Sequence, residues 1–182
     1  MIAILLSISN IECNAQLFNN ADDKISNYEN ELKSMIGKNA QNWILQKGNF
    51  ISLSELRGNA VLLEFSGVGC GACKKVEKDI CEIDSLYKNG KFKSIIIEFF
   101  PHGGTLINYN SKTNSHHNSS FTFISPNYID YDDISKKYGV KAYPTFFLID
   151  KNGVIKYTHL GFFYDNTKSK MLEEINKVLH SN

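Results

Sequence analysis

The sequence predicts an α/β fold with a central mixed β-sheet flanked by helices. Two nearly continuous apolar runs, residues 60–65 and 94–99, are typical of strands that are buried on both faces. A helical pattern lies between the two runs, and a strand–helix–strand crossover makes such strands parallel. Further along the chain, residues 145–149 and 154–158 flank Lys151-Asn152-Gly153, a turn signal typical of an antiparallel hairpin.

Length and composition indicate one globular domain with a short extension. The 182 residues are 42% hydrophobic and 21% charged, which is ordinary for a protein that buries a core. A net charge of +1 gives no field that would attract nucleic acid or an anionic membrane surface. We therefore expect no nucleic-acid partner, and we expect a monomer.

The first fifteen residues differ from the rest of the chain. Residues 2–8 form a short apolar run, and Cys13-Asn14-Ala15 resembles the small-residue cleavage site of a secretory signal peptide. The run is too short to span a bilayer. Because the charged start of a signal peptide is missing, a frayed or wrongly assigned N-terminus is the alternative. We expect residues 1–15 to be a cleaved signal peptide, which predicts a periplasmic or secreted protein.

The remaining elements follow in order. Residues 16–36 are expected to form a helical extension, because apolar residues recur at helical spacing over 22–36. The main domain is expected over 37–182, and short strands near 43–45 and 50–52 and a helical turn at 54–58 open it. Other expected elements are a helix with apolar residues at 72, 76, 80, 83 and 87, a strand near 121–125, a helix near 131–138 and a C-terminal helix around 171–179. Residues 101–120 are polar and without pattern, so we expect a mobile inserted loop there.

The motif Cys70-Gly71-Ala72-Cys73 lies where the first buried strand passes into the helix. A thiolate at that point faces the unpaired backbone N–H groups and the positive dipole end of the helix, which lower its pKa. We therefore expect Cys70 to be the attacking nucleophile of a disulfide exchange and Cys73, one turn inside the helix, to resolve the mixed disulfide.

Other uses of the cysteine pair fit the sequence less well. A structural zinc site needs four ligands, and no second Cys-x-x-Cys or His-x-x-x-His accompanies the motif. Covalent haem attachment needs histidine at position 74, where the chain has Lys74. Cys81 follows Cys73 by eight residues, about 12 Å along a helix, which is too far for a disulfide between them. His102 and the pair His116-His117 are weaker candidates, because only their positions support a role.

Three ordered blocks of sequence carry a family resemblance. They are residues 37–43 followed by 52–65, the stretch from Cys70 to Lys75, and residues 138–153 around Tyr143-Pro144. These blocks resemble the TlpA/ResA-type thioredoxin-like proteins, and the resemblance covers residues 37–180 with 101–120 unmatched.

The resemblance implies a thioredoxin-like fold with an N-terminal hairpin extension and an inserted strand and loop. It implies a thiol–disulfide oxidoreductase, more often a reductase, that acts on exported client proteins with cysteines and is recharged by a membrane thiol donor. The redox-active disulfide would then be the redox centre, with no bound cofactor or metal. Pro144 is implied to be cis and to pack beside the cysteines, with Tyr143 bordering the substrate.

Glu64 is the third residue that we expect to take part in the chemistry. It lies six residues before Cys70, where thioredoxins keep a buried acid near the resolving cysteine. Burial between Leu63 and Phe65 would raise the pKa of its carboxyl, so that it could take the proton of Cys73. The alternative is that Glu64 points to an open sheet edge.

The chain departs from the family pattern at Gly69 and Ala72, where tryptophan and proline are usual. These departures leave the redox potential and the client range open. A peroxiredoxin would need Pro-x-x-x-Thr-x-x-Cys, but Leu63 and Gly67 occupy the proline and threonine positions. A non-catalytic partner-binding or chaperone module on the same scaffold is the alternative from a different class.

Overall fold

The computed structural model describes residues 21–181 apart from 48, 88–89, 100–121, 125–127 and 163–165. Two compact units are distinguished along the chain, one ending at Ser34 and the other beginning at Met35. In the first unit, residues 21–33 form a helix, close to the predicted 22–36. The predictions for 1–15 and for the loop 101–120, with His102, His116 and His117, lie outside the described residues.

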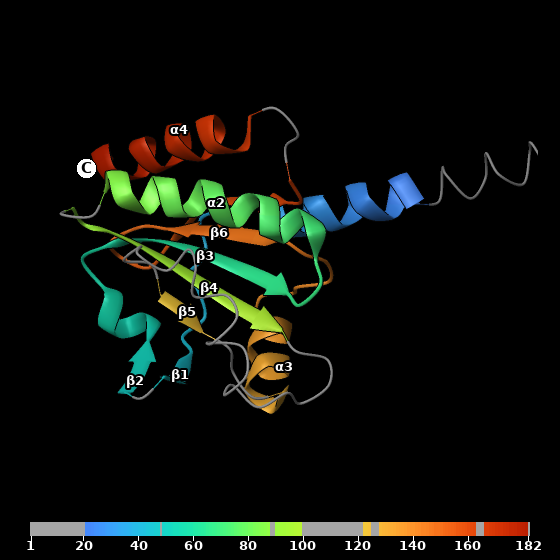
Figure 1. The fold of residues 1–182 in the computed structure, drawn as a ribbon, viewed down its shortest axis with the longest axis horizontal. Coiled ribbons are helices and arrows are strands. Elements are labelled where there is room, and N and C mark those ends of the chain that lie inside the picture. Colours follow the sequence, from blue (N-terminus) through green and yellow to red (C-terminus); the bar gives the residue numbers. More distant parts are fainter. Residues whose placement is uncertain are drawn as a thin grey trace, which may run out of the picture. The chain divides into compact units, whose positions relative to one another are not determined.

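The second unit contains a five-stranded mixed sheet, as predicted. Its strands are β3 (Ala60–Gly67), β4 (Phe92–Phe99), β5 (Thr122–Ile124), β6 (Thr145–Ile149) and β7 (Ile155–Leu160). Their order in the sheet is β5-β4-β3-β6-β7 (Figure 1). The β3–β4 and β4–β5 pairs are parallel, and β6 is antiparallel to both β3 and β7. Because β3 has a partner on each side, it is a central strand.

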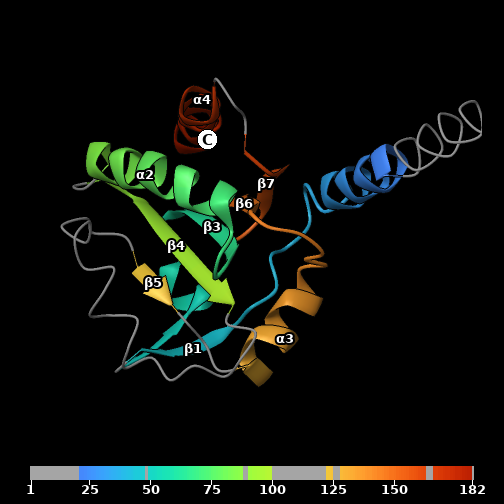
Figure 2. The ribbon, with the colours of Figure 1, turned by 45° about the vertical axis from the view of Figure 1, so that its right-hand side comes forward.

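Helices cover both faces of this sheet. The helices α2 (Gly71–Leu86) and α4 (Thr167–His180) lie over one face, and α3 (Tyr128–Lys137) lies by the other, as Figures 1 and 2 show from two directions. The predicted apolar stripe of α2 is buried at Val76, Ile80 and Ile83. These three side chains pack in one core with Met171 and Ile175 of α4.

A smaller hairpin precedes the main sheet. It consists of β1 (Ile44–Lys47) and β2 (Asn49–Ser52), which pair antiparallel. A 3₁₀ turn, η1 (Leu53–Leu56), follows and begins with a capping box. In this box the Ser52 N–H donates to Glu55 Oε2 at 2.7 Å, and the Glu55 N–H donates to Ser52 Oγ at 3.4 Å.

All residues of β3 are buried, so its side chains alternate between two cores. Ala60 and Leu62 belong to the core beneath α2 and α4. On the opposite face the ring of Phe65 lies 5.4 Å from that of Tyr138 and 5.9 Å from that of Phe147, measured between centroids. The alternation places Glu64 on the same face as Leu62, which is the face that α2 covers.

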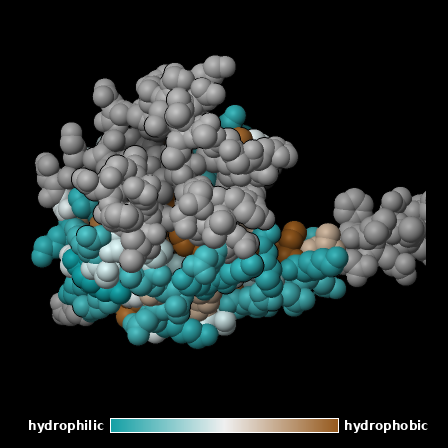
Figure 3. Space-filling model, turned by 90° about the horizontal axis from the view of Figure 1, so that it is seen from below, coloured by the Kyte–Doolittle hydropathy of each residue, from teal (hydrophilic) through white to brown (hydrophobic). Residues whose placement is uncertain are grey.

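Large hydrophobic side chains are rarely exposed in the described part of the chain. Those that are exposed are Ile25, Ile36, Val68 and Leu86. On the face drawn in Figure 3, the described residues are mostly hydrophilic, with hydrophobic ones at isolated spots. Val68 differs from the other three because it lies two residues before Cys70.

Phe65→Ala should strongly destabilise the fold, because it removes the ring that packs against Tyr138 and Phe147 on the face of β3 opposite α2. We expect a loss of about 3–5 kcal/mol in the free energy of unfolding, measured by urea denaturation of the oxidised protein. The control is Leu86→Ala, a change at a side chain that is 65% exposed, which should alter stability by less than about 0.5 kcal/mol. Similar losses in both variants would contradict this description of the core.

Candidate active site

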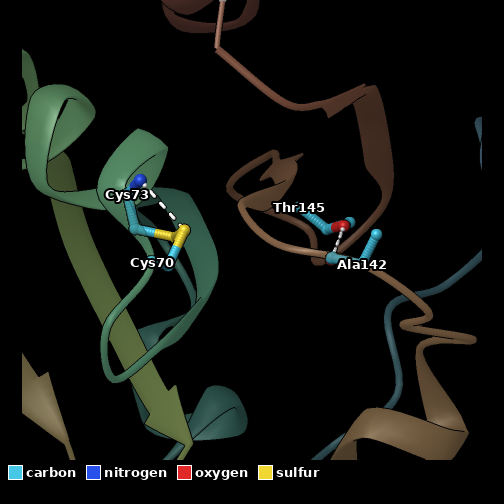
Figure 4. The surroundings of a disulfide bond; sticks show 4 residues. All are labelled: Cys70, Cys73, Ala142 and Thr145. Atoms are coloured by element: carbon cyan, nitrogen blue, oxygen red, sulfur yellow. Dashed lines mark hydrogen bonds between the residues drawn. A yellow bond between two sulfur atoms is a disulfide. The ribbon is translucent and has the colours of Figure 1, made fainter.

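Cys70 and Cys73 form a disulfide at the start of α2. Cys70 is the N-cap residue of the helix, and its Sγ accepts a hydrogen bond from the Cys73 N–H at 3.1 Å (Figure 4). The two Cα atoms are 5.3 Å apart. Cys70 is half-buried, whereas Cys73 is only 4% exposed. The strand-to-helix position expected for the motif is therefore observed.

The turn that carries Cys70 depends on a glycine. Gly69 has a φ of 84°, in the left-handed region that side chains other than glycine rarely adopt. This backbone conformation explains why glycine stands directly before the first cysteine. Exposed Lys74 and Lys75 follow in the first turn of the helix, and Lys75 Nζ lies 5.8 Å from the centroid of the Phe162 ring.

The loop before β6 comes close to this turn. The Tyr143–Pro144 peptide bond is cis, in agreement with the resemblance. A Cβ atom on Gly67 would lie 2.8 Å from Tyr143 Cδ2, so the Tyr143 ring rests directly against the Gly67 backbone. Thr145 Oγ1 donates a hydrogen bond to the Ala142 carbonyl at 2.7 Å, and in Figure 4 this loop faces the disulfide.

A cavity of about 110 Å³ opens beside the cysteines. Its lining comes from β3, β4, the β3–α2 turn and the first turns of α2. The residues that line it are Glu64, Ser66, Gly67, Val68, Gly69, Cys70, Cys73, Lys74, Glu77, Ile96 and Glu98. The cavity therefore brings both sulfur-bearing residues together with three glutamates.

Glu64 lies inside the protein, so the alternative of an open sheet edge is wrong. Its side chain is 1% exposed, and β3 is paired with β4 on one side and β6 on the other. Burial raises the pKa of the Glu64 carboxyl well above its usual range, and the nearby carboxylates of Glu77 and Glu98 raise it further. Glu64 Oε2 has no hydrogen-bond partner among the described residues. A carboxyl in these surroundings favours the protonated form and can exchange a proton with a neighbouring group.

Glu77 and Glu98 were not singled out from the sequence. Glu77 follows Cys73 by four residues, which places both on one face of a helix. Glu98 follows Ile96 by two residues and therefore shares its face of β4. Both spacings are readable in the sequence, but the side chains meet Glu64 only through the packing of α2 and β4 on β3.

The remaining cysteine of the described residues lies further along α2. Cys81 is half-buried and takes no part in the disulfide, as its distance along the helix from Cys73 predicted. It lines a second, outer hollow of about 350 Å³ with Lys74, Glu77 and Lys78.

Across the described ranges, no group of three or more His, Cys, Asp or Glu side chains is placed to bind a metal ion together. None of the helices in those ranges is both long and apolar enough to cross a bilayer.

The fold and the cysteine site are those of the thioredoxin-like thiol–disulfide oxidoreductases. The redoxin family model matches residues 35–178, so the chain belongs to the redoxin family. The thiol-disulfide oxidoreductase ResA of Bacillus cereus is 30% identical over 154 residues, which cover 83% of each chain. The thioredoxin-like protein YneN of Bacillus subtilis is 26% identical over 133 residues, or 70% of each chain.

Solved structures agree with this family. A protein of Chlorobium tepidum assigned as a thiol:disulfide interchange protein DsbE matches with a TM-score of 0.68 and 26% identity, over 79% of this chain and 97% of its own. The thioredoxin domain of a thiol-disulfide oxidoreductase from Bacteroides vulgatus has the same fold, with a TM-score of 0.65 and 20% identity over 78% of this chain and 98% of its own. The predicted thioredoxin-like fold is confirmed, and the chain is a thiol–disulfide oxidoreductase of the TlpA/ResA type.

Gly67→Ala should displace the Tyr143 ring, because the added methyl group would overlap it. We expect a destabilisation of about 1–3 kcal/mol in urea unfolding, typical of overpacking. In a Tyr143→Ala background the same Gly67→Ala change should cost much less, since the ring is gone. Equal costs in both backgrounds would show that Gly67 does not make room for Tyr143.

Proposed function

We propose that the chain reduces disulfides of client proteins through Cys70 as the attacking thiol, Cys73 as the resolving thiol and Glu64 as the base that takes the proton of Cys73. The observation that carries this proposal is the position of Cys70. It caps α2, and its Sγ accepts the Cys73 N–H. A backbone donor and the helix dipole both stabilise a thiolate at this sulfur once the disulfide is reduced.

The different exposure of the two cysteines supports their separate roles. Cys70 is half-buried and can be approached from outside, whereas Cys73 is 4% exposed and sits on the inner side of the helix. A client sulfur would meet Cys70 first. We propose that Tyr143 and Pro144 border the client chain at this point, since the Tyr143 ring lies against Gly67 in the same turn.

The proposed reaction has two steps, and together they transfer two electrons to the client. The Cys70 thiolate attacks a client disulfide, forms a mixed disulfide and releases one client sulfur, which takes a proton from water. Cys73 then gives its proton to Glu64, and its thiolate attacks Cys70 Sγ. The bond from Cys70 to the client breaks, and the second client sulfur leaves and is protonated by water. The client gains two electrons, and the enzyme is left with the Cys70–Cys73 disulfide.

The need for an internal base follows from the burial of Cys73. A thiol that is almost out of contact with water cannot easily lose its proton to solvent, and burial disfavours the thiolate. Glu64 lines the same cavity as Cys73. In its ionised form the Glu64 carboxylate is a strong proton acceptor, because burial and like charges favour its protonated form.

We also propose that the protein acts on exported clients with cysteines and is itself recharged by a membrane thiol donor. Two features support export: the apolar run and small-residue site at residues 1–15, and the similarity to ResA. The redox-active disulfide is proposed as the redox centre, without a bound cofactor.

The division of labour between the cysteines predicts opposite results for two variants. Cys73→Ala should accumulate a covalent mixed disulfide between Cys70 and a disulfide-containing probe such as insulin, because the resolving thiol is gone. Cys70→Ala should accumulate none. Intact-mass analysis after non-reducing separation measures both, and Cys81→Ala should behave as wild type. Equal trapping by the two variants would overturn the assignment.

Glu64→Gln should slow the resolving step while leaving the first attack by Cys70 nearly unchanged. Proton transfer by a positioned group is typically worth about 10²–10⁴-fold, so we expect a loss of roughly 10²-fold in resolution near neutral pH. Single-turnover kinetics separate the two steps, and the rate of the first attack is the internal control. Equal resolution rates in variant and wild type would remove Glu64 from the mechanism.

A further inference from the structure

Two glutamates on neighbouring strands face the same side of the sheet. The parallel register of β3 and β4 pairs Glu64 with Ile96 and Ser66 with Glu98. Glu64 and Glu98 are therefore diagonal neighbours on the face that α2 covers. With strands about 4.8 Å apart and about 3.3 Å per residue, their Cα atoms lie roughly 8 Å apart, so glutamate side chains can approach each other closely.

Both side chains are removed from water and border one cavity. Glu64 is 1% exposed and Glu98 is 6% exposed. Both line the cavity of about 110 Å³ that also borders Cys73. Glu64 Oε2 is a buried polar atom with no hydrogen-bond partner among the described residues. Two carboxylates this close in a poorly solvated space cannot both be ionised at low cost.

The other titratable groups around Glu64 come from few elements. From α2 and the turn before it, the cavity receives Cys70, Cys73, Lys74 and Glu77. From β6, the residue paired with Glu64 is Phe146, which carries no charge. Among the described residues, α4 contributes no titratable group to the cavity lining. Glu98 is thus the acidic neighbour that is itself buried, whereas Glu77 is half-exposed.

We propose that Glu64 and Glu98 act as a coupled carboxyl pair that holds one proton between them beside Cys73, and that this pair sets the pH at which the resolving step becomes fast. The second half of this proposal rests on the proton role proposed above for Glu64. Glu98 is a positioning residue in this scheme, since it acts on Cys73 only through the charge it places next to Glu64.

The direction of the effect follows from the like charges. A negative charge on Glu98 disfavours ionisation of Glu64 and so raises the pKa of the Glu64 carboxyl. Without that charge, Glu64 ionises at lower pH and becomes ready to accept the Cys73 proton at lower pH. The pH profile of resolution should therefore move to lower pH when Glu98 is neutralised, while the first attack by Cys70 stays unchanged.

The test is a carboxyl titration of the oxidised protein, in which the Cys70–Cys73 disulfide has no proton to lose. The ¹³C signals of the Glu64 and Glu98 carboxyl groups are followed by NMR from about pH 4 to about pH 10, which spans the usual carboxyl and thiol ranges. In the wild type, each signal should report two steps that belong to the pair. In Glu98→Gln, the Glu64 signal should show one step, with a midpoint lower than the upper wild-type midpoint by about one pH unit or more.

Two control variants test whether the change in the Glu64 titration is specific to Glu98. Asp79→Asn removes a carboxyl of α2 that does not line the cavity, and it should leave the Glu64 titration unchanged. Glu77→Gln should also lower the Glu64 midpoint, but that shift should shrink in high salt because Glu77 is half-exposed and therefore screened. The shift caused by Glu98→Gln should persist in high salt, because both members of that pair are buried.

The outcomes separate this proposal from the proposed function. Independent single-step titrations of Glu64 and Glu98 in the wild type would overturn the pair, even if the Glu98→Gln variant failed to fold. The same follows from a Glu64 midpoint that is equal in wild type and Glu98→Gln. A shifted NMR midpoint with an unshifted pH profile of resolution would overturn the second half of the proposal, whereas the proton role of Glu64 is decided separately by the single-turnover kinetics of Glu64→Gln. The trapping results for Cys70 and Cys73 are independent of all these measurements.

Discussion

The burial of β3 along its whole length is the constraint on which the site depends. A strand that is covered on both faces must leave the core at its end, and here it does so through Gly67 and Gly69 into α2. Cys70 therefore sits at the boundary between core and solvent, at the end of a helix whose first N–H groups have no partners within the helix. The same strand carries Glu64 three residues before its end at Gly67, on the face that α2 covers. The sulfur chemistry and the buried carboxyl are thus positioned by one structural element.

Two electrostatic effects in this site act in opposite directions, one on the sulfur of Cys70 and the other on the carboxyl of Glu64. At Cys70, the helix terminus and the Cys73 N–H favour a negative charge on sulfur. At Glu64, burial and the neighbouring carboxylates of Glu77 and Glu98 disfavour a negative charge on oxygen. The pKa of the Glu64 carboxyl is thereby raised well above its usual range. In the proposed mechanism, this makes the ionised Glu64 carboxylate a strong acceptor for the proton of Cys73.

Much of this arrangement was predictable from the sequence, because it depends on local patterns. The apolar runs identified β3 and β4, the spacing of Val76, Ile80 and Ile83 identified α2, and the motif identified the cysteine pair. The cis bond before Pro144 came from the family resemblance rather than from any pattern. The positions of Glu77 and Glu98 were missed, because their proximity to Glu64 depends on strand register and on how α2 packs. The pairing of Ser66 with Glu98 depends on the register between β3 and β4, and the hydrophobic pattern of neither strand alone predicts it.

The separation of electron and proton chemistry gives a reason for acidic residues in an apolar core. Oxidation of two thiols releases two protons. The proton of Cys70 can leave directly to solvent, because that residue is half-buried at the helix terminus. Cys73 is 4% exposed, and in the proposed mechanism its proton moves into the cavity that it shares with Glu64 and Glu98. A buried carboxyl ionises only at a cost in solvation. In the proposed pair, the negative charge on Glu98 raises that cost further, so an ionised Glu64 carboxylate binds a proton more tightly than it would alone.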